Sequence, residues 1–346
     1  MTSTIDRPTQ TPTIAAQAPQ LIAHIAGYVA HRTISMGLRQ GLIRGFADAP
    51  GSSADDLAAA LGLDPFYVTV WCRSAIAAGV LDRTGEGYRL ADHLDTLLLD
   101  DRSPAYVGGV FGVMEAREMF GRFEENFATG DRMWWNDTSP DWIAAVAGTG
   151  TPFYTRLVPG GLAQVPGLAE RLEAGCRVVD TACGSGVGLI RLARQYPRCE
   201  IVGVDGDQHS IDEAGSRLAD AGLADRVELI CSPLEEMSIG RPAHLVINNI
   251  SMHECRDIDQ VATTVGAALE PGGWFVISDF PFPDTDETLR TPPGRVMSGI
   301  QFFEAQIDDQ LLPRAAYDDL LTRHGFAELG SVQLTPMHAL THGRRP

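Results

Sequence analysis

The feature that most constrains the fold is the stretch from Val178 to Gly188, which reads VVDTACGSGVG. It is typical of a short buried strand, a glycine-rich turn and the start of a helix. Glycines permit the positive φ angles of such a turn and let a ligand approach the backbone closely. In a nucleotide-binding α/β fold, this turn lies at the carboxyl end of the first strand, where ligands bind. The stretch therefore predicts a ligand-binding turn.

A second stretch, Ile201 to Asp205, supports this interpretation because it reads as an apolar strand that ends in an acid. Asp205 follows Gly184 by 21 positions. An acidic residue about 20 positions after the glycines is placed to bind ribose hydroxyls. The alternative is an ordinary strand, turn and helix with a surface acid. Together, the two stretches favour a cofactor that contains a nucleoside.

The second half of the chain alternates strands with helices. We expect strands at 177–180, 200–204, 227–230, 244–248, 274–279, 326–334 and 337–341, and helices at 187–195, 209–222, 257–269 and 315–323. Apolar strands separated by helices imply a parallel sheet covered on both faces. The predicted fold class is α/β, a Rossmann-like, doubly wound and mostly parallel sheet, preceded by a mainly α winged-helix-like domain.

Four segments divide the chain: a disordered tail at 1–20, a winged-helix-like domain at 21–103, a helical connector at 104–165 and the α/β domain at 166–346. The tail is rich in Thr, Pro, Ala and Gln. An apolar helix is expected at 21–46, and such a helix needs a partner. Residues 51–100 show two capped helices, the first with Ser52 and Asp55 as its expected capping box, and a hairpin turn at Thr84–Gly87, a winged-helix pattern.

A winged helix suggests DNA binding, but the charge of this chain opposes it. Residues 51–100 hold eight acids and three arginines, and the whole chain carries a formal charge of −18. Nucleic-acid binding relies on clustered Lys and Arg. We therefore expect a structural or dimerisation role for this domain, no nucleic-acid partner and no membrane partner. A winged-helix transcription regulator is the alternative from another class.

Six scattered cysteines complete the general picture: Cys72, Cys176, Cys183, Cys199, Cys231 and Cys255. No two of them have CxxC spacing, so a zinc or redox motif is not expected. The pattern suits a reducing cytoplasm. Because the start of the chain lacks the features of a signal peptide, we expect a cytoplasmic protein.

The connector carries many aromatic side chains, and most of them are expected to be core. Trp134 and Trp135 are the exception. Adjacent residues point in different directions, so both are not expected in one core, and one of them is a candidate to face a ligand. Phe153 is a further candidate for the roof of a substrate pocket.

The order and spacing of these motifs resemble those of class I S-adenosylmethionine-dependent methyltransferases. More narrowly, residues 21–341 are similar to the small-molecule O-methyltransferases, in which a winged-helix-like dimerisation domain precedes the catalytic domain. The resemblance implies S-adenosyl-L-methionine as cofactor, a small-molecule acceptor and a homodimer. The cofactor-binding residues that it implies are Asp180, Ala182, Gly184, Gly186, Asp205, Gly206, Ser232, Pro233 and Asn248.

His253 carries the chemistry that the resemblance implies. It matches the histidine that deprotonates the acceptor hydroxyl in this family, and Glu254 matches the acid beside it. An unperturbed imidazole has a pKa of about 6.5, which suits a general base. Glu254 and Asp279 are candidates to orient the base or the substrate. Acceptor contacts are expected from Trp134, Trp135, Phe153, Asp279, Gln301 and Phe302, with Glu304 as a further polar contact.

Some positions depart from the family pattern. Ala182 stands where the family usually has its first glycine, and a methyl group is tolerated there if the local φ is negative. Ser232 replaces a usual acid. Some relatives methylate carbon with a metal held by two histidines, but segment 295–304 contains none, so no metal is expected. C-methylation and chemistry without methyl transfer stay open as alternatives to O-methylation.

Overall fold

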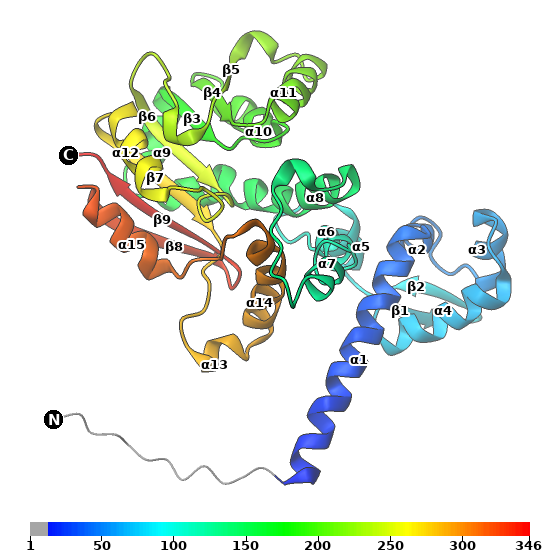
Figure 1. The fold of residues 1–346 in the computed structure, drawn as a ribbon. Coiled ribbons are helices and arrows are strands. Elements are labelled where there is room, and N and C mark those ends of the chain that lie inside the picture. Colours follow the sequence, from blue (N-terminus) through cyan, green and yellow to red (C-terminus); the bar gives the residue numbers. More distant parts are fainter. Residues whose placement is uncertain (1–12) are drawn as a thin grey trace. The chain divides into compact units, whose positions relative to one another are not determined.

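The computed structural model describes residues 13–346, which divide at Asp100 into two compact units. The unit that ends at Asp100 is mostly helical and carries one hairpin (Figure 1). Its helices are α1 (Ile14–Arg39), α2 (Leu42–Asp48), α3 (Ala54–Leu61), α4 (Pro65–Ala77) and α5 (Leu94–Leu99), and its strands are β1 (Leu81–Thr84) and β2 (Gly87–Leu90).

Two expectations for this region are wrong in detail. Residues 14–20 belong to α1 and are not a disordered tail, whereas residues 1–12 lie outside the described residues. The helix expected at 21–46 is interrupted, because Gly41 adopts a left-handed φ of 72° between α1 and α2. The helices and the hairpin expected in residues 51–100 are present. Helix α2 packs against α4, where the Phe46 ring stacks on the Trp71 ring.

The second unit begins with helices and ends with the sheet (Figure 1). Its helices are α6 (Gly108–Val113), α7 (Gly121–Glu125), α8 (Pro140–Arg156), α9 (Leu168–Ala174), α10 (Val187–Gln195), α11 (Gln208–Asp220), α12 (Ile258–Ala268), α13 (Asp286–Leu289), α14 (Pro292–Glu304) and α15 (Arg314–Arg323). Its strands are β3 (Arg177–Thr181), β4 (Glu200–Asp205), β5 (Val227–Cys231), β6 (Ala243–Asn249), β7 (Leu269–Asp279), β8 (Ala327–Thr335) and β9 (His338–Arg344).

The seven strands form one sheet in the order β5-β4-β3-β6-β7-β9-β8. The first five strands of that order are parallel, and β9 and β8 close the sheet as antiparallel strands. The predicted fold class is confirmed: the sheet is mostly parallel and doubly wound. The strand order reverses direction between β3 and β6, which makes a switch point where ligands bind in open α/β sheets.

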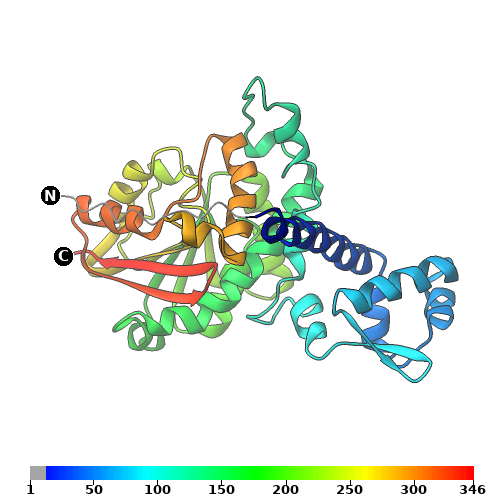
Figure 2. The same cartoon turned by 90° about the horizontal axis from the view of Figure 1, so that it is seen from below.

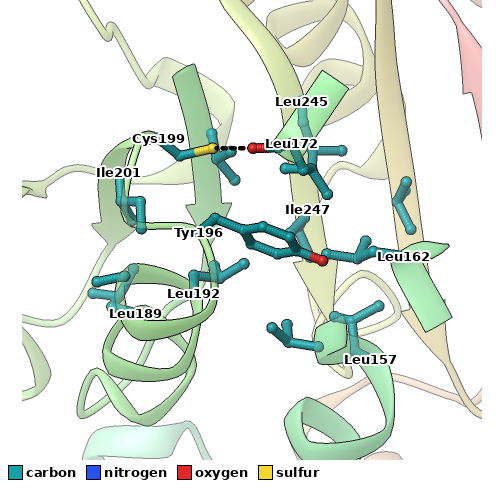
Figure 3. Packing of buried hydrophobic residues seen from close by; sticks show 14 of the residues in the cluster. Leu157, Leu162, Leu172, Leu189, Leu192, Tyr196, Cys199, Ile201, Leu245 and Ile247 are labelled. Atoms are coloured by element: carbon teal, nitrogen blue, oxygen red, sulfur yellow. Dashed lines mark hydrogen bonds between the residues drawn. The ribbon is translucent and has the colours of Figure 1, made fainter. Parts of the chain in front are cut away.

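Alternate side chains along each strand enter two separate cores, because successive residues of a strand point to opposite faces. Val178 packs with α9, α10 and α11, whereas the next residue, Val179, packs with α12 and α15. Figure 2 shows helices on both sides of the sheet. Figure 3 shows part of the first core, where the Tyr196 ring lies among leucines and the Cys199 Sγ is directed at the Leu172 carbonyl oxygen, 3.3 Å away.

Over residues 13–346, none of the helices combines the length and the apolar character needed to cross a membrane.

Candidate active site

The predicted site residues gather at one edge of the sheet, where the parallel strands β3, β4, β6 and β7 end. Thr181 pairs with Asn248 and Asn249 pairs with Ser278, so the loops after β3, β6 and β7 leave neighbouring strands at the same level. The turn at 182–186, Asp205, His253 and Asp279 therefore all belong to this edge. The sequence anticipated this grouping because Asp205 and Asp279 end apolar strands, whereas the turn and His253 come within a few residues after one.

The glycine-rich turn is built to leave its outer surface open. Gly184 and Gly186 have φ angles of 52° and 80°, in the region that favours glycine. A Cβ on Gly184 would meet no heavy atom within 4 Å, so the space beside it is free. A Cβ on Gly186 would lie 3.0 Å from the Cβ of Ala214, so this glycine allows close packing against α11.

Asp205 is tied to this turn by hydrogen bonds. The Gly184 N–H donates to its Oδ2 at 2.8 Å, and the Asp207 N–H donates to its Oδ1 at 2.9 Å. Burial raises the pKa of Asp205, and the backbone hydrogen bonds oppose this effect. The carboxylate is thus fixed in orientation at the end of β4. Each oxygen has a further lone pair that can accept from a hydroxyl.

Ala182 lacks the negative φ at which an alanine is tolerated in this turn. Its φ is +55°, not negative, so a residue with a Cβ occupies the left-handed region. This conformation is strained for an L-residue. The chain turns sharply directly after β3, so the alanine takes a conformation that the family's glycine would adopt without strain.

Asp180 lies beneath the turn and is completely buried. The Tyr154 hydroxyl donates to both of its carboxylate oxygens, at 3.1 and 3.0 Å. Burial raises the pKa of Asp180 to about 7, and the hydrogen bond from Tyr154 opposes this shift. Asp180 therefore links α8 to β3.

The other predicted cofactor residues surround this turn. Ser232 and Pro233 follow β5, and the Ser232 N–H donates to the Asp205 carbonyl oxygen at 2.9 Å. A Cβ on Gly206 would meet the Pro233 Cα only at 3.8 Å. Asn248 is buried at the end of β6, where its Nδ2 donates to the Thr181 hydroxyl at 3.2 Å. Asn248 thus joins two strands.

His253 forms a hydrogen-bonded group with two residues of other elements. Its Nδ1 lies 2.8 Å from the Asp279 Oδ2, at the end of β7. The same Oδ2 accepts from the Tyr317 hydroxyl of α15 at 2.6 Å, and the Asp279 Oδ1 accepts from the Phe280 N–H at 2.7 Å. Because Asp279 accepts from these donors, it acts as a carboxylate that receives the Nδ1 proton. The Nε2 of His253 is then directed away from Asp279.

Two more carboxylates face this nitrogen. The Oε1 atoms of Glu254 and Glu304 each lie 3.8 Å from the His253 Nε2. Burial lowers the pKa of His253, but the charges and hydrogen bonds of Asp279 and Glu304 outweigh it and hold the pKa well above its usual value. Burial and the charge of Glu304 raise the pKa of Glu254 well above its usual value. The imidazole is therefore a strong proton acceptor when it is neutral.

The predicted acceptor residues lie on several sides of this region. Trp134 stacks under the Arg256 guanidinium at 4.2 Å, and Trp135 packs on the buried Phe303 at 5.1 Å. Phe153 is buried between Phe280 and His338. The two tryptophans therefore contact different partners, as their adjacency predicts.

Two predicted acceptor contacts point elsewhere. The Gln301 Oε1 accepts from the Leu311 N–H, so this side chain fixes the loop after α14. Phe302 is partly exposed and packs on Phe120 and Phe123. In the aromatic pair of α14, the buried member beside the tryptophans is Phe303.

Sequence reasoning missed four contributors to the site. Tyr154 and Tyr317 supply the hydroxyls that hold Asp180 and Asp279, and the pairing of Glu304 with His253 was not foreseen. Ile250, directly after β6, has a φ of +50°, which is strained for a β-branched residue. The sequence singles out Glu304 as a polar contact of the acceptor but holds no signal that pairs it with His253.

The residues at this edge fit a nucleoside-bearing cofactor. The open space beside Gly184 and the fixed carboxylate of Asp205 provide a surface that a ribose can approach and an acid that can accept from its hydroxyls. The strand order of the sheet and the position of this turn are those of the class I methyltransferase fold.

Comparison with known proteins agrees. Residues 172–312 match the model of a methyltransferase domain family. The chain is 28% identical over 103 residues to a malonyl-[acyl-carrier protein] O-methyltransferase of Priestia megaterium, a match that covers 30% of this chain and 36% of that relative.

Two solved structures share the fold over nearly their whole length. An O-methyltransferase family protein from Burkholderia thailandensis superposes with a TM-score of 0.71 and 19% identity, covering 97% of this chain and 99% of that one. Human N-acetylserotonin methyltransferase in complex with S-adenosylmethionine gives 0.71 and 15%, covering 97% and 99%. Residues 172–312 therefore form a methyltransferase domain, and the chain shares the fold of these two solved structures.

Proposed function

We propose that the protein transfers a methyl group from S-adenosyl-L-methionine to an oxygen of a small, partly apolar or aromatic metabolite, with His253 as general base. The observation that carries this proposal is the His253–Asp279 pair at the end of β6 and β7. The turn that would hold the cofactor follows β3, the neighbour of β6. A base and a cofactor site on adjacent strands suit a reaction between two bound molecules.

The cofactor supplies a sulfonium methyl group that is ready to leave, so the protein has to bind, orient and deprotonate. Gly184, Gly186 and Asp205 would hold the methionine portion and the ribose. Asp279 keeps the Nδ1 proton of His253 in place, which leaves Nε2 to take the proton of an acceptor hydroxyl. Tyr317 holds Asp279 in turn. This arrangement orients the base before the acceptor arrives.

The aromatic cluster supports an apolar or aromatic acceptor. The side chains of Trp142, Phe303 and Met119 are buried together, and Trp134 and Trp135 pack against them with part of their surfaces exposed. Apolar walls with a few polar groups are typical of small-molecule sites. We propose Trp134 and Trp135 as acceptor contacts. We do not propose Gln301 and Phe302 as acceptor contacts. The Gln301 side chain contacts Leu311, and the Phe302 ring packs on Phe120 and Phe123.

The first test is binding of S-adenosylhomocysteine, measured by isothermal titration. A folded protein that does not bind it would contradict the cofactor assignment. With an accepted substrate, His253→Ala is expected to lower turnover by about 10²–10⁴-fold while the affinity for S-adenosylhomocysteine stays the same. His324→Ala, a change directly after α15 at a histidine paired with Asp259, is the control and is expected to keep turnover. Normal turnover of His253→Ala would remove the base from the mechanism.

Mass spectrometry of the product separates the chemical alternatives. Methyl transfer adds one CH₂ unit to the acceptor, and fragmentation locates it on oxygen, nitrogen or carbon. Tight cofactor binding without a methylated product from any acceptor would favour chemistry other than methyl transfer.

We further propose that the protein is a homodimer that associates through α1. Leu21, Ile22, Ile25, Tyr28 and Val29 on this helix are 50–64% exposed. Their spacing places them on one face of the helix. A row of exposed large apolar side chains favours a protein partner.

A further inference from the structure

The His253 side chain has one nitrogen occupied and one directed at two acids. Nδ1 is bound to Asp279, whereas Nε2 lies 3.8 Å from the Glu254 Oε1 and 3.8 Å from the Glu304 Oε1. One ligating atom from each of the three residues lies within 4.8 Å of the other two. This triangle is small enough to be closed by a single ion.

The Asp279 contact prepares the imidazole for an ion. A histidine that ligates a metal almost always donates its other ring N–H to a carboxylate or carbonyl group, which fixes the tautomer. Asp279 accepts from Tyr317, from the Phe280 N–H and from His253, so it is fixed in place as this partner. Nε2 is then directed at the two acids, and it offers a lone pair to an ion in exchange for its proton.

Glu304 provides the second, independent observation. Its side chain is 4% exposed, and among residues 13–346 its Oε2 is a buried oxygen without a hydrogen-bond partner. A buried carboxylate oxygen without a partner is costly. The largest charge effects on the neighbouring Glu254 come from three acids, Glu304, Asp279 and Asp309, and from His253. A cation bound by the Glu304 Oε1 would offset the charge of this buried carboxylate and its repulsion with Glu254.

We propose that His253, Glu254 and Glu304 bind one divalent transition-metal cation. One imidazole nitrogen and two carboxylates suit Mn²⁺, Fe²⁺, Co²⁺ or Zn²⁺, because imidazole favours the later metals and carboxylate the harder ones. Ligand bonds of about 2.0–2.2 Å require the three atoms to draw somewhat closer than 3.8 Å. The Glu254 side chain is 20% exposed, the most of the three proposed ligands.

This site goes beyond the proposed function and affects it. A cation on Nε2 occupies the lone pair that would take the acceptor's proton. The bound cation is therefore expected to slow methyl transfer. The expectation that the chain holds no metal counted histidines and cysteines and left out the carboxylate of Glu304.

The test uses the full chain, stripped with a chelator and titrated with Co²⁺. Visible absorption of Co²⁺ reports nitrogen and oxygen ligands, and isothermal titration gives stoichiometry and affinity. We expect one Co²⁺ per chain. Glu304→Gln, which keeps the shape of the side chain, is expected to weaken binding by about 10–100-fold. Asp309→Asn removes a nearby charge without removing a ligand, and a loss of no more than about 3-fold is expected.

The outcomes decide the proposal without reference to activity. No saturable Co²⁺ binding by the folded wild type, or equal affinity in the wild type and Glu304→Gln, overturns it. Circular dichroism establishes that each variant is folded. Turnover is a separate measurement: inhibition by Co²⁺ at the concentration that fills the site agrees with both proposals. A protein that binds Co²⁺ but transfers no methyl group keeps the site and loses the proposed function.

Discussion

At the scale of single residues, Ala182 and Gly184 allow the cost of a side chain in the left-handed region to be compared within one turn. They lie two positions apart in the same turn, with φ angles of +55° and +52°. A Cβ in this region costs about 1–2 kcal/mol. A glycine there costs about 0.4–1 kcal/mol through the greater freedom of the unfolded chain. Their backbone conformations are nearly equal, so they should respond to substitution in opposite directions.

Ala182→Gly is therefore expected to raise the free energy of unfolding by about 0.5–1 kcal/mol. Gly184→Ala is expected to lower it by a similar amount, although its new Cβ would contact nothing within 4 Å. Urea unfolding followed by circular dichroism measures both changes. Destabilisation by Ala182→Gly would show that the alanine methyl group contributes packing that outweighs its strain.

Asp180 predicts a pH dependence of stability. Burial raises its pKa from 3.8 to about 7. Between these values the folded state holds a proton that the unfolded state has lost, so this group's contribution to stability falls as pH rises and stays low above pH 7. Asp180→Asn removes the effect. The melting temperature of Asp180→Asn relative to wild type is thus expected to be higher at pH 8.5 than at pH 5.5. An unchanged difference would contradict the raised pKa.

The sequence predicted the place in the fold of those candidate residues that end a strand or follow one closely, among them Asp205, Asp279 and His253. Their position depends on the local pattern and on the rule that parallel strands end together. It did not predict Tyr154, Tyr317 or the pairing of Glu304 with His253, because each reaches the site from a helix whose path is set by tertiary packing. Nor did it predict the positive φ of Ile250, since nothing about an isoleucine favours that conformation.

At the scale of secondary-structure elements, strand and helix positions were predicted well because apolar periodicity is strong in this sheet. Helix α10 was predicted with the observed ends, Val187 and Gln195. The first strand of the sheet was predicted one residue short of Thr181. The errors lie at turns: Gly41 divides the first helix, and the capping box of α3 uses Ser53 and Asp56, not Ser52 and Asp55. A choice between adjacent serines depends on backbone angles that composition does not fix.

Two helix glycines test how packing competes with helix propensity. A Cβ on Gly188 of α10 would lie 2.1 Å from the Tyr154 ring, whereas a Cβ on Gly215 of α11 would meet only the Leu229 Cδ1, at 3.8 Å. Gly188→Ala is expected to destabilise the protein by about 1–3 kcal/mol through overpacking. Gly215→Ala is expected to stabilise it by about 0.5–1 kcal/mol. Chemical unfolding of both variants measures their free energies of unfolding. Equal changes in the two variants would contradict the prediction.

At the scale of the whole molecule, the sequence predicted a mostly parallel sheet with helices on both faces, and the structure confirms it. The alternation of strands and helices along the chain is what indicates a parallel sheet with helices on both faces. The two antiparallel strands at the end of the order were expected as closing strands, but their direction was not. The direction depends on tertiary pairing: β9 follows β8 after the short turn at 336–337 and lies between β8 and β7, so it runs antiparallel to both neighbours.

The association through α1 can be tested on the intact protein. Ile22 and Ile25 are 63% and 61% exposed, and both belong to the apolar row on this helix. Replacing both with glutamate would place two charges where apolar surface is expected to be buried between two copies, which opposes association. We expect the wild type to sediment as a dimer and Ile22→Glu/Ile25→Glu as a monomer. Ala23→Glu adds a charge on the opposite side of the same helix and is expected to leave the dimer intact. Dissociation by Ala23→Glu as well would mean that charge alone, and not the apolar row, controls association.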